Sequence, residues 1–146
     1  MYSHKRLLAV VLSVGLLLTA CGGASTPAPA GSDLMGKTWL WQYTAFNNGK
    51  TIPVLAPASY TLQFLEGGKI SLKADCNSGS GSYIVTNDVN LTIRVETMTK
   101  AACPAGSLSE EYVQELNDVG SYNIERDGEL VLALKSTGAG MRFKPQ

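Results

Sequence analysis

The sequence predicts an α+β, mostly β fold: a single domain of strongly curved, antiparallel, barrel-like sheet with one covering α-helix. Two observations predict it. From residue 34 onward, short runs of alternating apolar and polar residues are separated by turn residues, which is typical of β-strands. The stretch 107–120 breaks that alternation, because its apolar residues follow helical spacing.

The predicted strands form three hairpins between a first and a last strand. In the clearest hairpin, apolar residues alternate with polar ones over 60–64 and again over 70–74, with a turn at 66–68. Two further hairpins turn at 87–88 and 127–128, where Asn, Asp and Gly favour tight turns. The predicted segments, in chain order, are 39–44, 60–64, 70–74, 82–86, 90–96, 122–125, 130–135 and 140–144.

One amphipathic helix is predicted within residues 107–120. Ser107 and Glu110 have the spacing of a capping box, in which each side chain bonds a backbone N–H at the helix start. Gly120 stands where the helix is expected to end. The apolar face, which is expected to pack on the sheet, consists of Leu108, Tyr112, Leu116 and Val119.

The apolar residues are numerous enough for one core at this chain length. Trp39 and Trp41 lie two positions apart on a predicted strand and therefore face the same side. We expect core positions for both, whereas an exposed pair would mark a binding surface. The predicted core consists of Trp39, Leu62, Phe64, Ile70, Leu72, Leu91, Ile93, Tyr112, Leu116, Leu132 and Phe143.

Residues 1–20 are predicted to be a secretory signal peptide. Basic residues at 4–6 precede an apolar run over 7–18 that is too short to span a bilayer. Leu18-Thr19-Ala20-Cys21 resembles the bacterial lipobox, which implies acyl chains such as palmitate on Cys21. Two or more chains anchor a protein stably. We therefore expect a lipoprotein bound to a membrane of the bacterial cell envelope through Cys21, facing the periplasm or the exterior.

Residues 21–33 are predicted to be the lipidated cysteine and a flexible tether, because this Gly-, Ala- and Pro-rich stretch lacks apolar residues to bury. The folded domain is predicted over 34–146. The only histidine, His4, leaves with the signal peptide, and ten of the twelve basic side chains remain against twelve acidic ones. This near balance argues against nucleic acid as a partner. A monomer is expected.

Two cysteines remain once Cys21 is lipidated, and export carries them into an oxidising compartment. Cys76 and Cys103 are therefore predicted to form a disulfide. A redox or nucleophilic role would require a C-x-x-C spacing or a nearby base, and the sequence offers neither.

The segments 75–83 and 99–104 read DCNSGSGSY and TKAACP. Their Cys-Asn-x-x-x-Gly and Thr-x-x-x-Cys-Pro patterns resemble the META domain family, also described as HslJ-like, and the resemblance covers residues 34–146. It implies one unit of antiparallel strands with one helix, found in envelope lipoproteins, some linked to heat stress or antibiotic tolerance. Members are not known as enzymes. Asp75, Asn77, Gly79 and Gly81 are expected to form a turn that backbone geometry explains.

No catalytic or metal-binding constellation is predicted. Without a histidine in the mature chain, neither a Ser-His-Asp arrangement nor a histidine-based zinc site is possible. Asp75-x-Asn77-x-Gly79 begins like a calcium loop, but the later glycine and the closing glutamate are missing. Asp75, Asp88 and Glu96 could supply a carboxylate pair for glycoside hydrolysis, but each occupies a turn or strand edge that usually carries a solvated charge. We therefore expect no enzyme, no cofactor and no metal.

Three functions fit these observations. The first is a non-enzymatic META-type envelope lipoprotein with a binding, structural or stress-tolerance role at the membrane surface. An envelope protein is its expected partner. The second is an inhibitor of a cell-wall lytic enzyme or protease, for which the loops 56–59 and 136–140 are the candidate inserting segments. The third is a small-ligand carrier, which requires a cavity in place of a filled core.

Overall fold

The computed structural model describes residues 30–146, so the predicted signal peptide and Cys21 lie outside the described residues. None of the helices in that part is long and apolar enough to cross a membrane. The first described residues are attached to the rest of the fold, because Tyr122 OH donates a hydrogen bond to Asp33 Oδ1 at 3.1 Å. The folded domain thus includes the last residues of the predicted tether.

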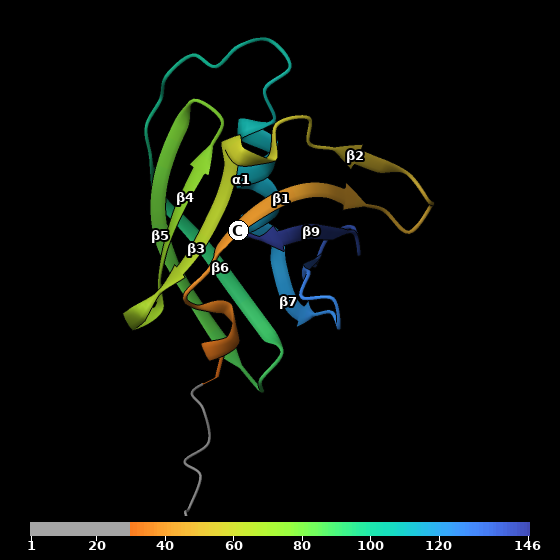
Figure 1. Cartoon of the computed structure of the whole chain (residues 1–146). Coiled ribbons are helices and arrows are strands. Elements are labelled where there is room, and N and C mark those ends of the chain that lie inside the picture. Colours follow the sequence, from red (N-terminus) through yellow and green to blue (C-terminus); the bar gives the residue numbers. More distant parts are fainter. Residues whose placement is uncertain (1–29) are drawn as a thin grey trace, which may run out of the picture.

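Nine strands and one α-helix make up most of the described part of the chain (Figure 1). The helix α1 covers Ser109–Asp118, and three short 3₁₀ helices, η1 to η3, cover Ser32–Leu34, Pro57–Ser59 and Glu66–Gly68. The strands are β1 (Thr38–Ala45), β2 (Thr51–Pro53), β3 (Tyr60–Leu65), β4 (Lys69–Ala74), β5 (Asn77–Thr86), β6 (Asn90–Met98), β7 (Val119–Ile124), β8 (Leu130–Leu134) and β9 (Gly140–Pro145).

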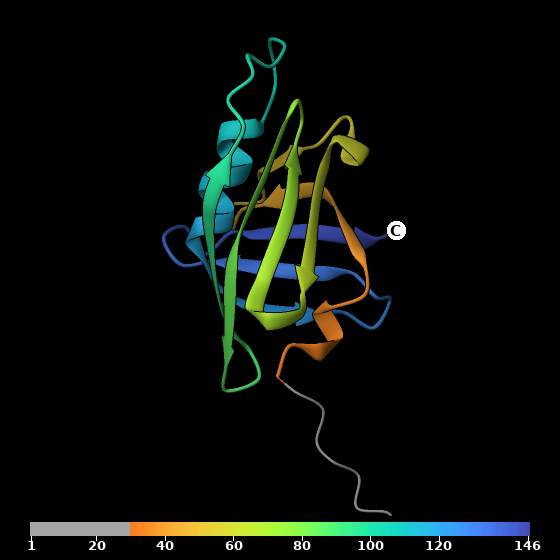
Figure 2. The ribbon, with the colours of Figure 1, turned by 90° about the vertical axis from the view of Figure 1, so that its left-hand side faces the viewer.

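Eight of these strands close into an antiparallel barrel. Neighbours pair in the order β1-β3-β4-β5-β6-β7-β8-β9, and β9 pairs back with β1 from Trp39↔Pro145 to Ala45↔Gly140. The two views in Figures 1 and 2 show the sheet curling round on itself. β2 lies outside the ring and extends the edge of β1. The predicted mostly β, barrel-like fold with one helix is confirmed.

The three predicted hairpins are present as β3–β4, β5–β6 and β7–β8. Leu62 pairs with Leu72 in the first of them, so both side chains point into the barrel. Asn87 and Asp88 have φ angles of 51° and 62°, and Gly128 has 86°, which places tight turns where the sequence predicts them. The three-residue strand β2 was not predicted, because it is too short to show alternation.

The segment 77–81 is a strand and not the predicted turn. Gly79 and Gly81 both pair with β4 on one side and β6 on the other. The tight turn lies before this segment, where Asp75 has a φ of 58°. A Cβ on Gly81 would overlap the carbonyl oxygen of Arg94. The close approach of β6, rather than turn geometry, therefore requires glycine here.

The helix begins at Ser109, and the predicted capping box does not form. Ser107 Oγ accepts a hydrogen bond from the backbone N–H of Ser109 at 3.3 Å, not from that of Glu110. The N–H of Leu108 donates instead to Tyr60 OH at 2.8 Å. A tyrosine from β3 thus supplies part of the capping that the local sequence was expected to supply.

Gly120 does not end the helix. α1 ends at Asp118, and the chain enters β7 directly through Val119, whose ψ is 133°. Gly120 is the extra residue where the register between β7 and β8 shifts. A Cβ there would lie 2.6 Å from Lys135 Cγ, so the glycine makes room for a neighbouring side chain.

The helix covers the weakest seam of the barrel. β6 and β7 pair only at Asn90↔Ser121. Farther along, the edge of β6 faces α1, and Asn117 Oδ1 of the helix accepts a hydrogen bond from Val95 N at 2.9 Å. The helix side chain therefore replaces a strand as the hydrogen-bond partner of this edge.

Every residue of the predicted core is buried, and Trp39 and Trp41 are both 0% exposed. The tryptophan pair therefore belongs to the core and not to a binding surface. Trp41 stacks on Tyr112 of α1 with ring centroids 5.0 Å apart, and the edge of Tyr60 meets it at 5.6 Å. Large side chains thus occupy the barrel interior, which argues against the carrier interpretation.

Candidate functional site

The longest loop of the described chain, residues 99–108, joins β6 to α1 and is called the distal loop below. It projects from the end of the barrel opposite residue 30, the first described residue (Figure 1). Its middle is exposed and carries small apolar side chains: Ala101, Ala102, Pro104 and Ala105. A loop with this composition needs other contacts to hold its shape.

A disulfide is the first of these contacts. Cys76, which follows β4, is bonded to Cys103 of the distal loop, with the two Cα atoms 5.4 Å apart. The predicted pairing is confirmed. The bond attaches the loop to the barrel wall 27 residues earlier in the sequence.

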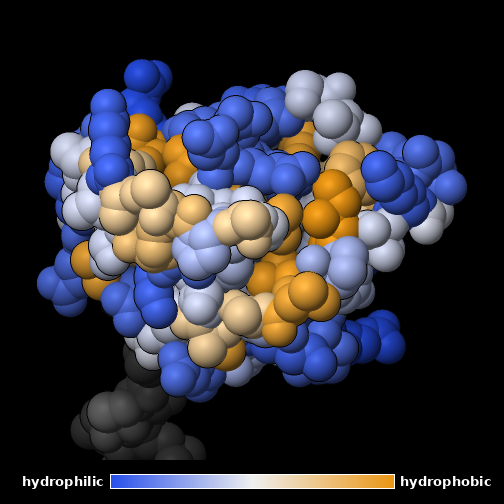
Figure 3. Space-filling view, turned by 90° about the horizontal axis from the view of Figure 1, so that it is seen from above, coloured by the Kyte–Doolittle hydropathy of each residue, from blue (hydrophilic) through white to orange (hydrophobic). Residues whose placement is uncertain are grey.

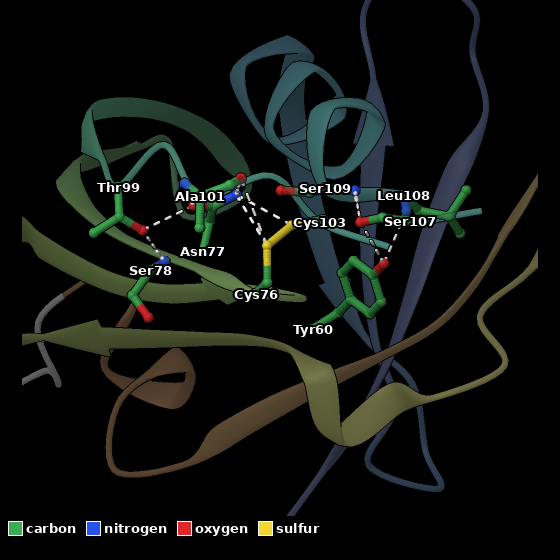
Figure 4. The surroundings of a disulfide bond; sticks show 10 residues. All are labelled: Tyr60, Cys76, Asn77, Ser78, Thr99, Ala101, Cys103, Ser107, Leu108 and Ser109. Atoms are coloured by element: carbon green, nitrogen blue, oxygen red, sulfur yellow. Dashed lines mark hydrogen bonds between the residues drawn. A yellow bond between two sulfur atoms is a disulfide. The ribbon is translucent and has the colours of Figure 1, made fainter. Parts of the chain in front are cut away.

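Asn77 holds the distal loop beside this disulfide (Figure 4). Its Oδ1 accepts hydrogen bonds from Ala101 N at 2.8 Å and from Thr99 Oγ1 at 3.0 Å. Its Nδ2 donates to Ala101 O at 3.2 Å and to Cys103 Sγ at 3.2 Å. One buried amide, 8% exposed, thus pairs with both backbone groups of Ala101. Asn77 and Thr99, which carry the family resemblance, therefore have a structural role in fixing the loop.

The far end of the distal loop is held by Tyr60. Its hydroxyl accepts the Leu108 N–H at 2.8 Å and lies 3.5 Å from Ser107 Oγ (Figure 4). Tyr60 is itself 5% exposed and packs against Trp41 in the core. The loop backbone is therefore fixed at Ala101, Cys103 and Leu108, while its alanine and proline side chains remain open to solvent.

The substitution Asn77→Ala is expected to lower the free energy of unfolding by about 1 to 2 kcal/mol, because a buried amide loses several hydrogen bonds. Hydrogen exchange at the Ala101 N–H is expected to accelerate. Urea unfolding and amide exchange measure both effects. Ser78→Ala is the matched control, since Ser78 is the exposed neighbour on the same strand. Equal stability of Asn77→Ala and the wild type would contradict the role of this amide.

Three grooves border the distal loop, the smallest of about 290 Å³ beside Cys103 and Ser107. The helix groove, of about 540 Å³, lies between the loop and the first turns of α1. The strand groove, of about 300 Å³, lies on the other side, beside Leu55, whose exposed fraction is 95%. Seen from this end, orange and tan hydrophobic residues cross the surface between blue hydrophilic ones (Figure 3). The helix groove is lined by Asn77, Met98, Thr99, Lys100, Ala101, Ala102, Ser109, Glu110, Val113 and Gln114.

The helix α1 is acidic. Its carboxylates are Glu110, Glu111, Glu115 and Asp118, and the helix contains no basic residue. Thr44 Oγ1 donates a hydrogen bond to Glu115 Oε2 at 2.6 Å. Burial raises the pKa of Glu115 above its ordinary value, the Thr44 hydrogen bond lowers it, and the carboxylates of Glu111 and Asp118 raise it further. The negative charge on Glu115 is therefore unfavourable in the free protein.

The folded-state pKa of Glu115 is raised, so folding favours the protonated form of its carboxyl group. The stability that this protonation contributes is fully present below the ordinary pKa of 4.5 and is lost as pH rises through the folded-state pKa. The variant Glu115→Gln keeps an acceptor for Thr44 without the charge. Its Tm is expected to exceed that of the wild type by a margin that grows as pH increases from 4 to 7. Thermal melts across this range measure the margin. Glu66→Gln, an exposed change on η3, is the control, and a pH-independent margin would contradict the assignment.

The three acidic residues that the sequence offered for a carboxylate pair lie on different elements of the structure. Asp75 lines the strand groove, Asp88 lies in the β5–β6 turn, and Glu96 on β6 accepts a hydrogen bond from Ser82 at 2.7 Å. Asp75 and Asp88 occupy opposite ends of the barrel and therefore do not form a carboxylate pair. Among residues 30–146, no group of three or more His, Cys, Asp or Glu side chains could hold a metal ion.

Neither loop predicted for an inhibitor is the projecting one. Residues 57–59 form η2, where Ser59 O accepts a hydrogen bond from Asp75 N, and 136–140 is a short turn beside Asp118. The distal loop projects instead (Figure 2). The sequence contained a signal for it, since residues 99–106 lack both strand alternation and helical spacing.

A family model described as META domain matches residues 32–146. No curated protein matches the chain. The fold is shared with a solved structure described as a protein from Burkholderia xenovorans, with 20% identity, a TM-score of 0.62, and coverage of 84% of this chain and 93% of that one. It is also shared with a DUF4847 family protein from Bacteroides vulgatus, with 16% identity, a TM-score of 0.57, and coverage of 75% and 92%.

Proposed function

Because this chain belongs to the META domain family over residues 32–146, we propose that it is a non-enzymatic envelope lipoprotein that binds another envelope protein through its distal loop. The observation that carries the proposal is a loop whose backbone is fixed at several points while its small side chains are exposed. The Cys76–Cys103 disulfide, Asn77 and Tyr60 supply the fixed points. A loop already held in one shape loses little conformational entropy on binding.

The position of the loop supports this proposal. Residues 21–29 lie between the predicted cleavage site and the described part of the chain. A chain of nine residues spans at most about 30 Å. With lipid on Cys21, residue 30 would lie within that distance of the membrane. The distal loop lies at the opposite end of the barrel from residue 30 (Figure 1). The loop is thus the part of the barrel farthest along the molecule from the attachment point, where other proteins can reach it.

Anchoring itself has a direct test. Cys21→Ser is expected to abolish incorporation of radiolabelled palmitate and to release the protein from the membrane fraction, because the lipid-bearing thiol is removed. Labelling and fractionation of cells measure both. The Cys76→Ser/Cys103→Ser variant is the control, since it removes two cysteines and leaves Cys21 in place. Palmitate incorporation into Cys21→Ser at the wild-type level would refute lipidation at this residue.

Photo-crosslinking in living cells tests binding by the distal loop. A benzophenone amino acid is placed at Ala102 or Ala105 in the loop, or at Ile84 on the barrel wall, whose exposed fraction is 65%. One adduct of defined mass is expected from both loop positions and none from Ile84. The purified crosslinked protein is then expected to bind the wild type and not Ala102→Arg, which places a long charged side chain on the loop surface.

Two outcomes would refute the proposed function. One is the absence of adducts at both loop positions. The other is the same adduct pattern from the loop and from Ile84, which would show contact by general proximity rather than by a defined surface.

An inhibitor of a lytic enzyme or protease is the second candidate, favoured by the same fixed and projecting loop. A loop of this kind fits an active-site cleft without first being ordered. The purified full chain is expected to inhibit one member of a panel of cell-wall lytic enzymes and proteases at equimolar concentration, and Ala102→Arg is expected not to. Full residual activity of every enzyme in the panel would rule out this candidate for those enzymes.

A further inference from the structure

Resting on the lipid at Cys21 that the proposed function includes, we propose that the barrel end at residue 30 docks on the surface of the lipid bilayer. Three exposed apolar side chains make the contact and are called the basal patch below: Leu65, Ile84 and Val89. The inference adds an orientation of the barrel on the membrane, which lipid attachment alone leaves open.

The basal patch holds most of the exposed large hydrophobic side chains within residues 30–146. Leu65 is 43% exposed, Ile84 65% and Val89 53%. The fourth, Leu55, lies near the other end of the barrel, beside the strand groove and the distal loop. Single exposed apolar residues are common on protein surfaces and need no partner. The gathering of three at one end favours an apolar partner there.

The β5–β6 hairpin carries two of these side chains and touches the first described residues. Gly31 lies against Val85, since a Cβ on the glycine would come within 2.8 Å of Val85 Cγ2. Asp33 and Val89 share one neighbour: Tyr122 OH donates to Asp33 Oδ1 at 3.1 Å, and Tyr122 N donates to Val89 O at 3.0 Å. The hairpin therefore lies beside the point at which the chain enters the barrel.

Leu65 lies at the same end of the barrel. It is the last residue of β3, and Met35 forms an isolated parallel bridge with Phe64, the residue before it. Figure 2 shows η3, which follows Leu65, at the same end as the orange η1 and the turn between β5 and β6. All three members of the basal patch are thus close to the start of the described chain.

The short stretch that precedes the described chain favours a bilayer as the partner of the basal patch. Residues 21–29 span at most about 30 Å, so residue 30 stays within that distance of a lipid on Cys21. A surface held this close has a high effective concentration. A contact too weak to bind a free protein is then enough to orient an attached one.

The charges around the basal patch limit the contact to the membrane surface. Glu66 follows Leu65, and Asp88 precedes Val89, and both carboxylates are exposed. Lys69, which pairs with Leu65 across the hairpin, is exposed as well. Charged side chains are costly in the hydrocarbon core and remain among the headgroups. The aliphatic side chains therefore reach only the boundary between headgroups and acyl chains, as the apolar face of an interfacial helix does.

Photo-crosslinking to lipid tests the contact. The benzophenone amino acid is placed at Leu65 or Val89 of the full chain, which is purified from the membrane fraction and returned to vesicles of phosphatidylethanolamine and phosphatidylglycerol. Irradiation joins the benzophenone carbonyl carbon to a carbon of a lipid that touches it, and the displaced hydrogen moves to the carbonyl oxygen. The chain therefore gains the mass of one phospholipid. Intact mass spectrometry is expected to show this gain at both positions.

Leu55 is the matched control position. It is also a leucine, is 95% exposed, and lies near the opposite end of the barrel. Benzophenone at this position is expected to give no lipid adduct. The comparison therefore separates contact at the basal patch from reaction of any exposed apolar position with lipid.

Ile84→Ser/Val89→Ser tests whether the apolar side chains, and not mere closeness to the lipid anchor, produce the contact. Both side chains are exposed, so the fold is expected to remain, as checked by circular dichroism. With benzophenone at Leu65, the yield of lipid adduct is expected to fall to that of the Leu55 position, because two of the aliphatic side chains that meet the bilayer are gone. Leu55→Ser is the control variant and is expected to leave the yield at Leu65 unchanged.

Four outcomes would overturn the inference. The first is the absence of lipid adducts at both Leu65 and Val89, and the second is an equal yield at Leu55. The third is a yield at Leu65 that Ile84→Ser/Val89→Ser does not reduce. The fourth is an adduct with a second copy of the chain in place of lipid, which would make the basal patch a protein interface.

Failure of this inference is distinguishable from failure of the proposed function. Palmitate labelling tests the anchor, and crosslinking in cells from Ala102 and Ala105 tests the distal loop, so neither depends on the basal patch. If both succeed and the vesicles give no lipid adduct, the orientation is wrong and the proposed function stands. If Cys21 carries no lipid, labelling alone reveals it, and both proposals are wrong. Ile84, held against lipid, remains a position from which no protein adduct is expected.

Discussion

Replacement of both disulfide cysteines, Cys76→Ser/Cys103→Ser, is expected to lower the free energy of unfolding by about 3 to 4 kcal/mol. The bond joins residues 27 positions apart, and removing it restores the conformational freedom of that loop in the unfolded chain. The loss is a large share of the stability of a domain of this size. Urea unfolding followed by circular dichroism measures it.

The barrel itself is expected to survive this change. Asn77 and Tyr60 still bond the distal loop, and the strand pairings do not depend on the disulfide. The far-ultraviolet spectrum should therefore match that of the wild type in the absence of urea. Chemical reduction of the wild-type protein is the matched comparison and is expected to give the same loss. A variant as stable as the oxidised protein would show that the bond contributes nothing to the fold.

Trp41→Ala is expected to cost about 3 to 5 kcal/mol, because it leaves a cavity at the contact between the barrel and the helix. Trp41 is 0% exposed, stacks on Tyr112, and meets the edge of Tyr60. Tyr60 in turn bonds the N–H of Leu108 at the end of the distal loop. The substitution is therefore expected to loosen the distal loop as well, measured as faster hydrogen exchange at the Leu108 N–H.

Trp41→Phe is the informative control. Within the described part of the chain, Trp41 Nε1 has no hydrogen-bond partner, so phenylalanine removes volume and no hydrogen bond. Its cost should be well below that of alanine and follow the smaller cavity. Urea unfolding of both variants provides the comparison. A phenylalanine variant as unstable as the alanine variant would contradict a role that rests on packing alone.

The elements with clear periodicity were predicted well. Alternation over 60–74 identified β3 and β4, and every residue of the predicted core is buried. The pairing of Cys76 with Cys103 followed from having only two cysteines after export. These features depend on spacing along the chain or on counting, both of which a single sequence displays directly.

The errors share a different origin. Gly81 was assigned to a turn, although the close approach of β6 is what requires glycine there. The helix start was assigned to a local capping box, although Tyr60, 48 positions away from Leu108, accepts the N–H in question. In both cases the deciding neighbour is distant in the sequence, so local spacing did not contain it.

The sequence by itself located eight of the nine strands, the amphipathic helix, the core and the disulfide, because alternation, helical spacing and cysteine number are local or countable properties. Only the tertiary structure decided how the barrel closes and what it brings together. Asn77 meets Ala101 across 24 residues, and Thr44 meets Glu115 across 71. Such contacts arise when β5 pairs with β6 and α1 packs beside β6, and the grooves that flank the distal loop arise with them.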